Sequence, residues 1–450
     1  MSEKTVTQDG ATQPGPESQP QPQPRPQAQS SARRPPLASR RRLLGGTVAL
    51  AAVAGAGAGA GYGVSRTARS TAAPTAAPDS VPFYGAHQAG VATPAQDRLA
   101  FAAFDVTASD AMSLQVLLGT WAAAAAQMAR GLPIGALETD PQSPPIDTGE
   151  AVGLGAASLT VTVGFGPSLF DDRFGLAPHR PAALADLPTL PGDGSLDPAR
   201  GGGDLCVQAC ADDPTVAFHA IRNLARLARG TAVMRWSQLG FGRTSSTSTA
   251  QQTERNLMGF KDGTRNVKAE DPADLDDFVW VGRETDQPWM KGGSYLVTRR
   301  IRMLIESWDT DHLADQENVF GRFKAGGAPL TGTDEFDTPD LAARHPGGEP
   351  VIPLNAHIRL ASPAANGGQK ILRRGYSYTD GIDPATGLLD AGLFFLAYQK
   401  DPRRQFVPIQ TRLGRQDNLN EYIRHTGSAL FAVPPGLGRA GDWWGKSLFG

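Results

Sequence analysis

The sequence predicts an α+β protein made of two ferredoxin-like halves, each with the element order β-α-β-β-α-β. Two observations support this fold class. Apolar residues recur with a strand or helix period in that order between residues 81 and 252, and the order returns after residue 253. The two halves share no obvious sequence repeat, so the duplication is inferred from the element order alone.

The periodicity places each element of the first half, residues 81–252. Strands are expected at 99–106, 158–164, 205–210 and 232–239, and helices at 110–130 and 216–228.

In the second half, residues 253–450, strands are expected at 294–300, 371–378, 393–399 and 429–433, with helices at 301–308 and near 403–413.

Two long connections, 132–157 and 306–359, are rich in Pro and Gly. They are longer than compact domains usually tolerate unless the loop has a function. A ligand between the sheet of the second half and its long loop would explain the second connection.

The composition is that of an ordinary soluble protein, with 40% hydrophobic and 20% charged residues in 450 positions. The formal net charge is −2. The first 73 residues hold nine Lys or Arg and three Asp or Glu, which leaves 34 basic and 42 acidic residues in the remainder. Because no basic stripe remains there to neutralise phosphates, we expect no nucleic-acid partner.

The N-terminal segment reads as a targeting sequence. Residues 1–38 are rich in Pro, Gln and Ser and are expected to be disordered. Residues 39–73 begin with SRRRLLG, continue as an uncharged Ala/Gly/Val run to Val64 and end in a small-residue stretch near Ala73, the layout of a twin-arginine export signal. The alternative is a transmembrane anchor, although the run is only weakly apolar. We expect export by the twin-arginine translocase to an extracellular, periplasmic or outer-face membrane location.

The two cysteines, Cys206 and Cys210, lie four positions apart on an expected strand. That spacing is too long for a disulfide, so both are expected to be buried packing residues. No C-x-x-C-H motif is present, which argues against covalent heme attachment.

One polar loop, NLMGFKDGTRN at residues 256–266, places a carboxylate between two glycines. Glycine tolerates positive φ and lets a flat ligand approach the main chain, so Gly259 and Gly263 suggest the walls of a cofactor site. Asp262 would then be its acid/base group. The alternative is an ordinary Asp-Gly turn.

Motifs elsewhere in the chain make the functional interpretation of this loop more specific. AHIRLASP at 356–363 and ILRRGYSY at 371–378 follow it, and FYGAHQAG at 83–90, GSYLVTRR at 293–300 and NEYIRHTG at 420–427 flank it. The order G-x-x-D-G, a lone His and then I-L-R-R-G resembles the dye-decolorizing peroxidase family. The resemblance runs from about Val81 to the C-terminus and is strongest to the exported, iron-uptake-associated branch of deferrochelatase/peroxidases.

The resemblance implies two α+β halves whose sheets pack around a non-covalent heme b. It also implies an enzyme that reduces hydrogen peroxide through a ferryl intermediate and oxidises aromatic or dye-like donors. One alternative is a role in iron uptake, by removal of iron from heme or by oxidation of ferrous iron for a permease. The other alternative is a non-catalytic heme carrier. The resemblance leaves open whether the protein forms a homo-oligomer.

Among seven histidines, His357 is flanked by apolar Ala356 and Ile358 and precedes an expected strand. It matches the proximal iron ligand of the family. A peroxidase histidine should donate its far ring N–H to a carboxylate, and Asp401 matches the position of that partner. The alternative for Asp401 is a cap of the following helix.

By resemblance, Asp262 moves the peroxide proton and Arg373 stabilises the charge that develops on the leaving oxygen. Arg374 is the alternative arginine, and on a strand the two side chains point to opposite faces. Some branches of the family carry an Asn two places after the distal Arg, where this chain has Gly375.

The remaining expected cofactor contacts are of three kinds. Arg359 is the candidate partner of a heme propionate, because a guanidinium pairs bidentately with a carboxylate. Residues of the glycine-flanked loop and three phenylalanines on expected strands would line the cofactor: Gly259, Phe260, Lys261, Gly263, Thr264, Phe394, Phe395 and Phe431.

Overall fold

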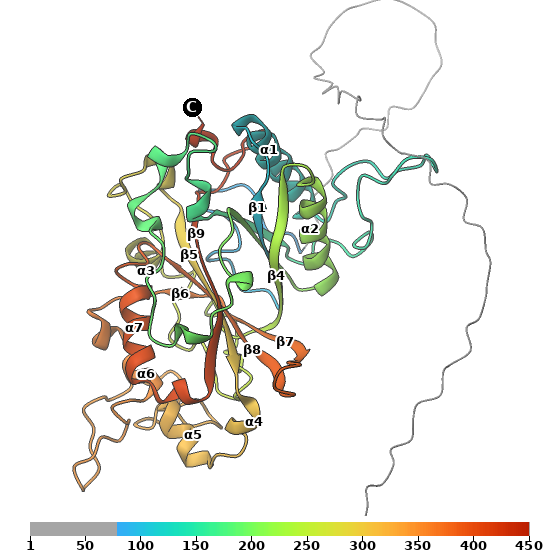
Figure 1. Ribbon diagram of the computed structural model, residues 1–450. Helices are drawn as coiled ribbons and strands as arrows, with labels where there is room; N and C mark the ends of the chain where they lie inside the picture. The colour runs from blue at the N-terminus through green and yellow to red at the C-terminus, as the bar shows by residue number, and fades with distance from the viewer. Residues whose placement is uncertain (1–78, 450) are drawn as a thin grey trace, which may run out of the picture. The chain divides into compact units, whose positions relative to one another are not determined.

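The computed structural model describes residues 79–449, which form a nine-stranded sheet in the order β5-β9-β2-β3-β1-β4-β7-β8-β6. All its strand pairs are antiparallel, and β5 also pairs with β8. This last pairing closes the sheet into a barrel that both halves of the chain build (Figure 1).

The first half has the predicted element order. Its elements are β1 (Arg98–Val106), α1 (Ala111–Met128), β2 (Thr160–Phe165), β3 (Leu205–Ala211), α2 (Pro214–Leu227) and β4 (Ala232–Arg243). Both helices begin at an aspartate cap: Asp110 accepts the Ser113 N–H at 2.8 Å, and Asp213 accepts the Thr215 N–H at 2.7 Å.

The second half repeats the order with added short helices. Its strands are β5 (Ser294–Met303), β6 (Leu372–Arg373), β7 (Tyr376–Ile382), β8 (Leu389–Gln399) and β9 (Ile423–Val433). Its helices are α3 (Pro272–Phe278), α4 (Ile305–Trp308), α5 (Leu313–Phe320), α6 (His357–Leu360) and α7 (Phe406–Gln416). Figure 1 shows α5, α6 and α7 grouped at one end of the sheet, away from α1 and α2.

Two expectations for this half need correction. The helix expected at 301–308 is reduced to α4, because β5 continues to Met303 in register with β8 and β9. The strand expected at 371–378 is interrupted after Arg373, where β6 ends and β7 starts three residues later.

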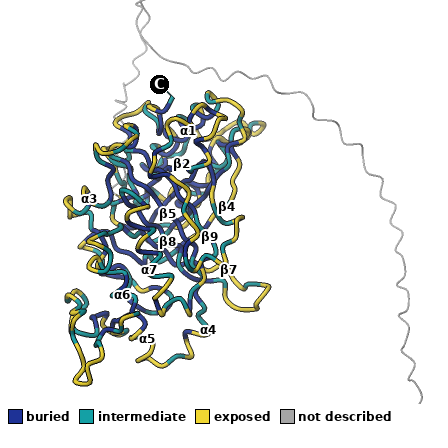
Figure 2. The backbone as a smooth tube through the Cα atoms, turned by 60° about the vertical axis from the view of Figure 1, so that its left-hand side comes forward, coloured by how far each residue is buried: buried dark blue, intermediate teal, exposed yellow. Residues whose placement is uncertain are grey.

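Side chains fill the interior of the barrel. On β1, Leu99, Phe101 and Ala103 point inward, whereas Ala100, Ala102 and Phe104 pack outward against α1 and α2. Strands β1, β2, β3 and β5 are buried over almost their whole length (Figure 2), whereas much of β4 is exposed. A cofactor therefore has to lie outside the barrel.

Cys206 and Cys210 are free and buried, as expected. Among residues 79–449, no helix is long and apolar enough to cross a membrane. The segments 1–38 and 39–73, expected to be disordered and to carry the export signal, lie outside the described residues. The domain boundaries at 81–252 and 253–450 stay predictions.

Candidate functional site

Asp262 and Arg373 form an ion pair, with 2.5 Å between Arg373 Nη1 and Asp262 Oδ1. Arg373 ends β6 and lies opposite Ala397 of β8, so its side chain is on the outer face of the barrel. Both side chains are partly accessible, at 26% and 15%. The structure thus brings together the two residues predicted to handle peroxide.

Asn266 fixes the main chain of Arg373. Its Oδ1 accepts the Arg373 N–H at 2.8 Å, and its Nδ2 donates to the Arg373 carbonyl at 2.7 Å. Because Asn266 comes from the same loop as Asp262, both members of the ion pair are held by one loop. Sequence reasoning missed Asn266, which is part of the quoted loop but was assigned no role.

Arg374 points the other way. It is fully buried, and its guanidinium donates to the Thr93 carbonyl at 2.5 Å and to Gln96. Gly375 has no room for a side chain, because an added Cβ would lie 2.7 Å from Thr244 Oγ1. The arginine facing Asp262 is therefore Arg373, and an asparagine could not replace Gly375 without displacing its neighbours.

The two loop glycines have the predicted left-handed conformation, with φ of +83° at Gly259 and +89° at Gly263. The close approach at each is to the chain itself. A Cβ at Gly259 would meet Lys324 Cε at 2.8 Å, and one at Gly263 would meet Ser245 Cα at 2.8 Å. These glycines shape the loop by contact with protein atoms, and direct contact with a flat ligand stays a prediction.

His357 opens the short helix α6 and donates from Nδ1 to Asp417 Oδ2 at 2.6 Å. Asp417 is itself fixed, because its Oδ1 accepts the Leu419 N–H at 2.9 Å and its side chain is only 3% exposed. Burial acts to lower the pKa of His357, but the charge of Asp417 and the hydrogen bond to it raise the pKa overall. The Nε2 atom is left for another partner.

Two expectations about His357 were wrong. It starts a helix and does not precede a strand. Its partner is Asp417, whereas Asp401 accepts the Arg403 N–H at 2.9 Å and pairs with the Arg403 guanidinium in the turn before α7. Asp401 thus stabilises a local turn, but it does not cap α7, whose N-cap residue is Gln405. One signal pointed to Asp417: a carboxylate at a helix C-terminus opposes the helix dipole and needs a partner.

His357 and the ion pair belong to one electrostatic site. The charge of Asp262 acts to raise the pKa of His357, and the charge of Arg373 acts to lower it. Phe320 lies 6.1 Å from the His357 ring and stacks on Phe260 at 4.1 Å, so an apolar cluster adjoins the histidine.

The four phenylalanines expected to contact the cofactor lie in three places. Phe395 is on the face of β8 that carries Ala397, and so on the side of Arg373. Phe394 and Phe431 point into the barrel, which corrects their assignment as cofactor contacts. Phe260 packs on Phe320 within the apolar cluster.

Arg359 donates to the carbonyls of Pro353 at 3.1 Å and Ile352 at 2.6 Å, which fixes the end of the long loop. Partial burial and the charge of Arg344 lower the pKa of Arg359. Two cations therefore lie close together, and within residues 79–449 neither forms an ion pair. No sequence pattern singled out Arg344.

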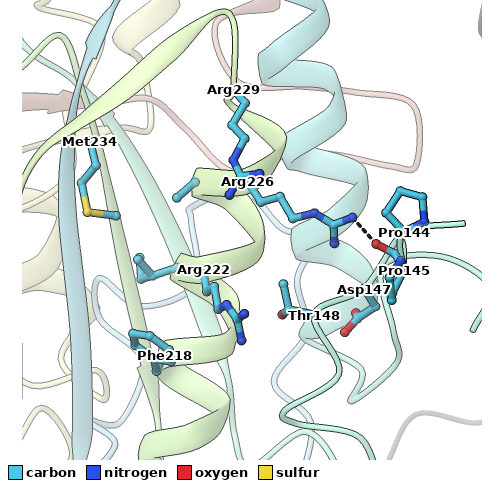
Figure 3. Close-up of a pocket in the computed structure, with 11 residues that line it drawn as sticks. Pro144, Pro145, Asp147, Thr148, Phe218, Arg222, Arg226, Arg229 and Met234 are labelled. Atoms are coloured by element: carbon cyan, nitrogen blue, oxygen red, sulfur yellow. Dashed lines mark hydrogen bonds between the residues drawn. The ribbon is translucent and has the colours of Figure 1, made fainter. Parts of the chain in front are cut away.

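A separate groove of about 540 Å³ lies between α2, β4 and residues 144–148 (Figure 3). Two of its three arginines are engaged: Arg222 pairs with Glu150 at 3.3 Å, and Arg226 donates to the Ile146 carbonyl at 2.7 Å. It shares no residue with the Asp262 site, and we assign it no ligand.

Comparison with known families identifies the chain. The model of the Dyp-type peroxidase N-terminal domain matches residues 88–242, and that of the C-terminal domain matches residues 253–438. The chain belongs to the Dyp-type peroxidase family.

Individual Dyp-type relatives match over nearly their whole length. The Deferrochelatase of Escherichia coli O6:K15:H31 is 40% identical over 416 residues, which cover 91% of this chain and 96% of that protein. A DyP-type peroxidase of Streptomyces coelicolor is 44% identical with a TM-score of 0.75, covering 82% of this chain and 97% of that one. Ferric DtpA of Streptomyces lividans is 43% identical with the same TM-score, covering 82% and 97%.

The residues present fit heme, the cofactor of Dyp-type peroxidases. His357 offers one imidazole nitrogen, since Asp417 occupies the other. An apolar cluster adjoins the imidazole, and Arg344 and Arg359 supply two cations without a paired carboxylate within the described residues. Such a set suits an apolar macrocycle with acidic substituents.

Proposed function

We propose that this peroxidase binds heme b through His357 and reduces hydrogen peroxide with Asp262 and Arg373, while aromatic or dye-like donors supply the electrons. Bound heme supplies the redox-active iron. The observation that carries the proposal is the 2.5 Å ion pair of Asp262 and Arg373 within the electrostatic reach of His357.

The two residues of the pair have different tasks. The Asp262 carboxylate takes the proton from one peroxide oxygen and returns it to the other as the O–O bond breaks. The Arg373 guanidinium stabilises the negative charge that develops on the leaving oxygen. Asn266 keeps Arg373 in place through two main-chain hydrogen bonds.

Asp417 acts through His357. A carboxylate that accepts the Nδ1 proton fixes the tautomer of the ring and makes Nε2 a stronger donor to iron. Arg359 and Arg344 are proposed to neutralise heme propionates, and Phe395 to contact the macrocycle edge.

The ligand assignment is tested with His357→Ala in the purified protein. We expect loss of most of the Soret absorbance, because one axial ligand anchors the iron. His312→Ala is the control, since the His312 side chain is 92% exposed. Full heme retention in His357→Ala would exclude His357 as the ligand.

The second candidate function is iron release from heme or oxidation of ferrous iron for a permease. It is favoured by the 40% identity to a protein named Deferrochelatase. Incubation with heme, with and without peroxide, followed by separation of heme from iron-free porphyrin distinguishes the two. Porphyrin formation without peroxide would favour release, whereas peroxide-dependent oxidation of several donors, iron(II) included, would favour the peroxidase.

A heme carrier would need His357 but neither Asp262 nor Arg373, so the ion pair argues against this third function.

We also propose that the protein is exported by the twin-arginine translocase, from the sequence SRRRLLG. Arg40→Lys with Arg41→Lys should leave a folded precursor in the cytoplasm. Undiminished secretion would indicate another route.

A further inference from the structure

The long loop between α5 and α6 forms hydrogen bonds and an ion pair with the loop that carries Asp262. Glu335 of the long loop accepts from Thr264 Oγ1 at 3.0 Å through Oε1, and its Oε2 forms an ion pair with Lys261. Lys261 and Thr264 lie on either side of Asp262 and Gly263. The Glu335 side chain is only 10% exposed, so this carboxylate is nearly enclosed by its partners.

Further contacts join the same two segments. Arg255 donates to the carbonyls of Lys324 and Ala325, both at 2.7 Å. Arg265 donates to the Phe336 carbonyl at 2.9 Å. A Cβ at Gly327 would lie 2.8 Å from Lys261 Cδ, so the segments are in van der Waals contact as well.

Glu335 also counters a local excess of positive charge. Burial acts to raise the pKa of Glu335, but Lys261 and neighbouring hydroxyl donors lower it overall, so the group is a carboxylate at neutral pH. Its charge acts on Arg322 and Lys268, both of which also experience the charge of Arg373. The charged groups around the site are Lys261, Asp262, Arg265, Lys268, Glu270, Arg322, Glu335, His357, Arg373 and Asp417.

We propose that Glu335 is a positioning residue for the peroxide reaction, which holds Lys261 and Thr264 and thereby sets the orientation and the electrostatic environment of Asp262. This inference rests on the proposed role of Asp262. It also gives a function to the long loop, which fixes Asp262 through Glu335 and ends at His357.

The first test measures amide hydrogen exchange in the purified heme-loaded protein, a readout that does not depend on activity. Glu335→Gln keeps the size of the side chain but removes its charge, and Thr264→Val removes one donor without any change of charge. Both should speed amide hydrogen exchange in residues 259–265, Glu335→Gln by on the order of tenfold or more, the loss typical of one charge-assisted hydrogen bond. Glu349→Gln, an exposed glutamate of the same loop, is the control. Unchanged exchange in Glu335→Gln would overturn the proposal.

The second test uses the heme-loaded protein and the pH dependence of the reaction with peroxide. A carboxylate is harder to protonate when a neighbouring negative charge is removed and easier when a neighbouring positive charge is removed. The acid limb of the profile should therefore move to lower pH in Glu335→Gln and to higher pH in Lys261→Met. A purely structural role would slow the reaction without these opposite displacements, and that result would overturn the proposal.

Asp262→Ala separates this inference from the proposed function. If Asp262→Ala reacts at the wild-type rate, the proposed role of Asp262 fails and the positioning role fails with it. If Asp262→Ala is slow while Glu335→Gln keeps the wild-type rate and profile, only the inference about Glu335 fails.

Discussion

His357 and Asp417 are 60 positions apart in the sequence and are joined by a hydrogen bond of 2.6 Å between Nδ1 and Oδ2. The orientation of the Asp417 carboxylate is fixed, because its other oxygen, Oδ1, accepts the Leu419 N–H. The end of α7 therefore fixes the imidazole proposed to bind iron.

We predict that Asp417→Asn retains heme but reacts with peroxide about 10- to 100-fold more slowly, the usual effect of removing a carboxylate behind a metal-bound histidine. The reduction potential of the iron should rise, since the imidazole becomes a weaker donor. Stopped-flow kinetics and a redox titration measure both quantities. Asp401→Asn is the matched control, and a larger effect there would restore Asp401 as the partner.

Gly263→Ala should destabilise the protein by about 3 kcal/mol or more, because positive φ is combined with a Cβ placed 2.8 Å from Ser245 Cα. Gly149 has a φ of +84° with nothing near its Cβ position, so Gly149→Ala should cost only about 1 kcal/mol. Denaturant unfolding measures both. Equal losses would show that the contact with Ser245 is relieved by a small shift.

Local periodicity predicted most of the fold. The first half was predicted well because its helices have aspartate caps and strands such as β1 are continuous apolar runs, buried on both faces. The helix expected from residue 301 was too long because pairing of β5 with β8 and β9 overrides local helical spacing. Such pairing joins segments far apart in sequence, which a local pattern does not contain.

The candidate site was predicted only in part. Asp262, Arg373 and His357 stand in short motifs, and the structure brings them into one site. Asp417 and Glu335 act through contacts across 60 and 74 positions, which no spacing rule indicates. Asp401 was chosen by resemblance and proved to be a local turn residue.

A buried histidine outside the site should make stability depend on pH. His425 is 3% exposed, and burial, together with the charge of Arg299, lowers its pKa to about 3. The unfolded chain binds a proton at this residue near pH 6.5, whereas the folded protein does so only near pH 3. Stability contributed by the neutral ring is therefore complete above pH 6.5 and is lost as the pH falls toward 3.

For a pKa difference of this size, the full loss of unfolding free energy is about 4–5 kcal/mol. We predict that His425→Gln has a shallower decline of unfolding free energy between pH 6.5 and 3 than the wild type, measured by urea unfolding at several pH values. His312→Gln, at an exposed position, should keep the wild-type slope. Identical slopes in His425→Gln and wild type would contradict the assignment.

The central claim is that Asp262 and Arg373 together carry out the peroxide chemistry. It is tested most directly by mixing heme-loaded Asp262→Ala and Arg373→Ala with peroxide in a stopped-flow spectrometer, beside Arg374→Met. We predict normal Soret bands in the first two variants and a peroxide reaction slower on the order of 100- to 1000-fold, with Arg373→Ala affected at least as strongly. Arg374→Met should keep its rate if it folds. Wild-type rates in both Asp262→Ala and Arg373→Ala would contradict the claim and favour a heme carrier.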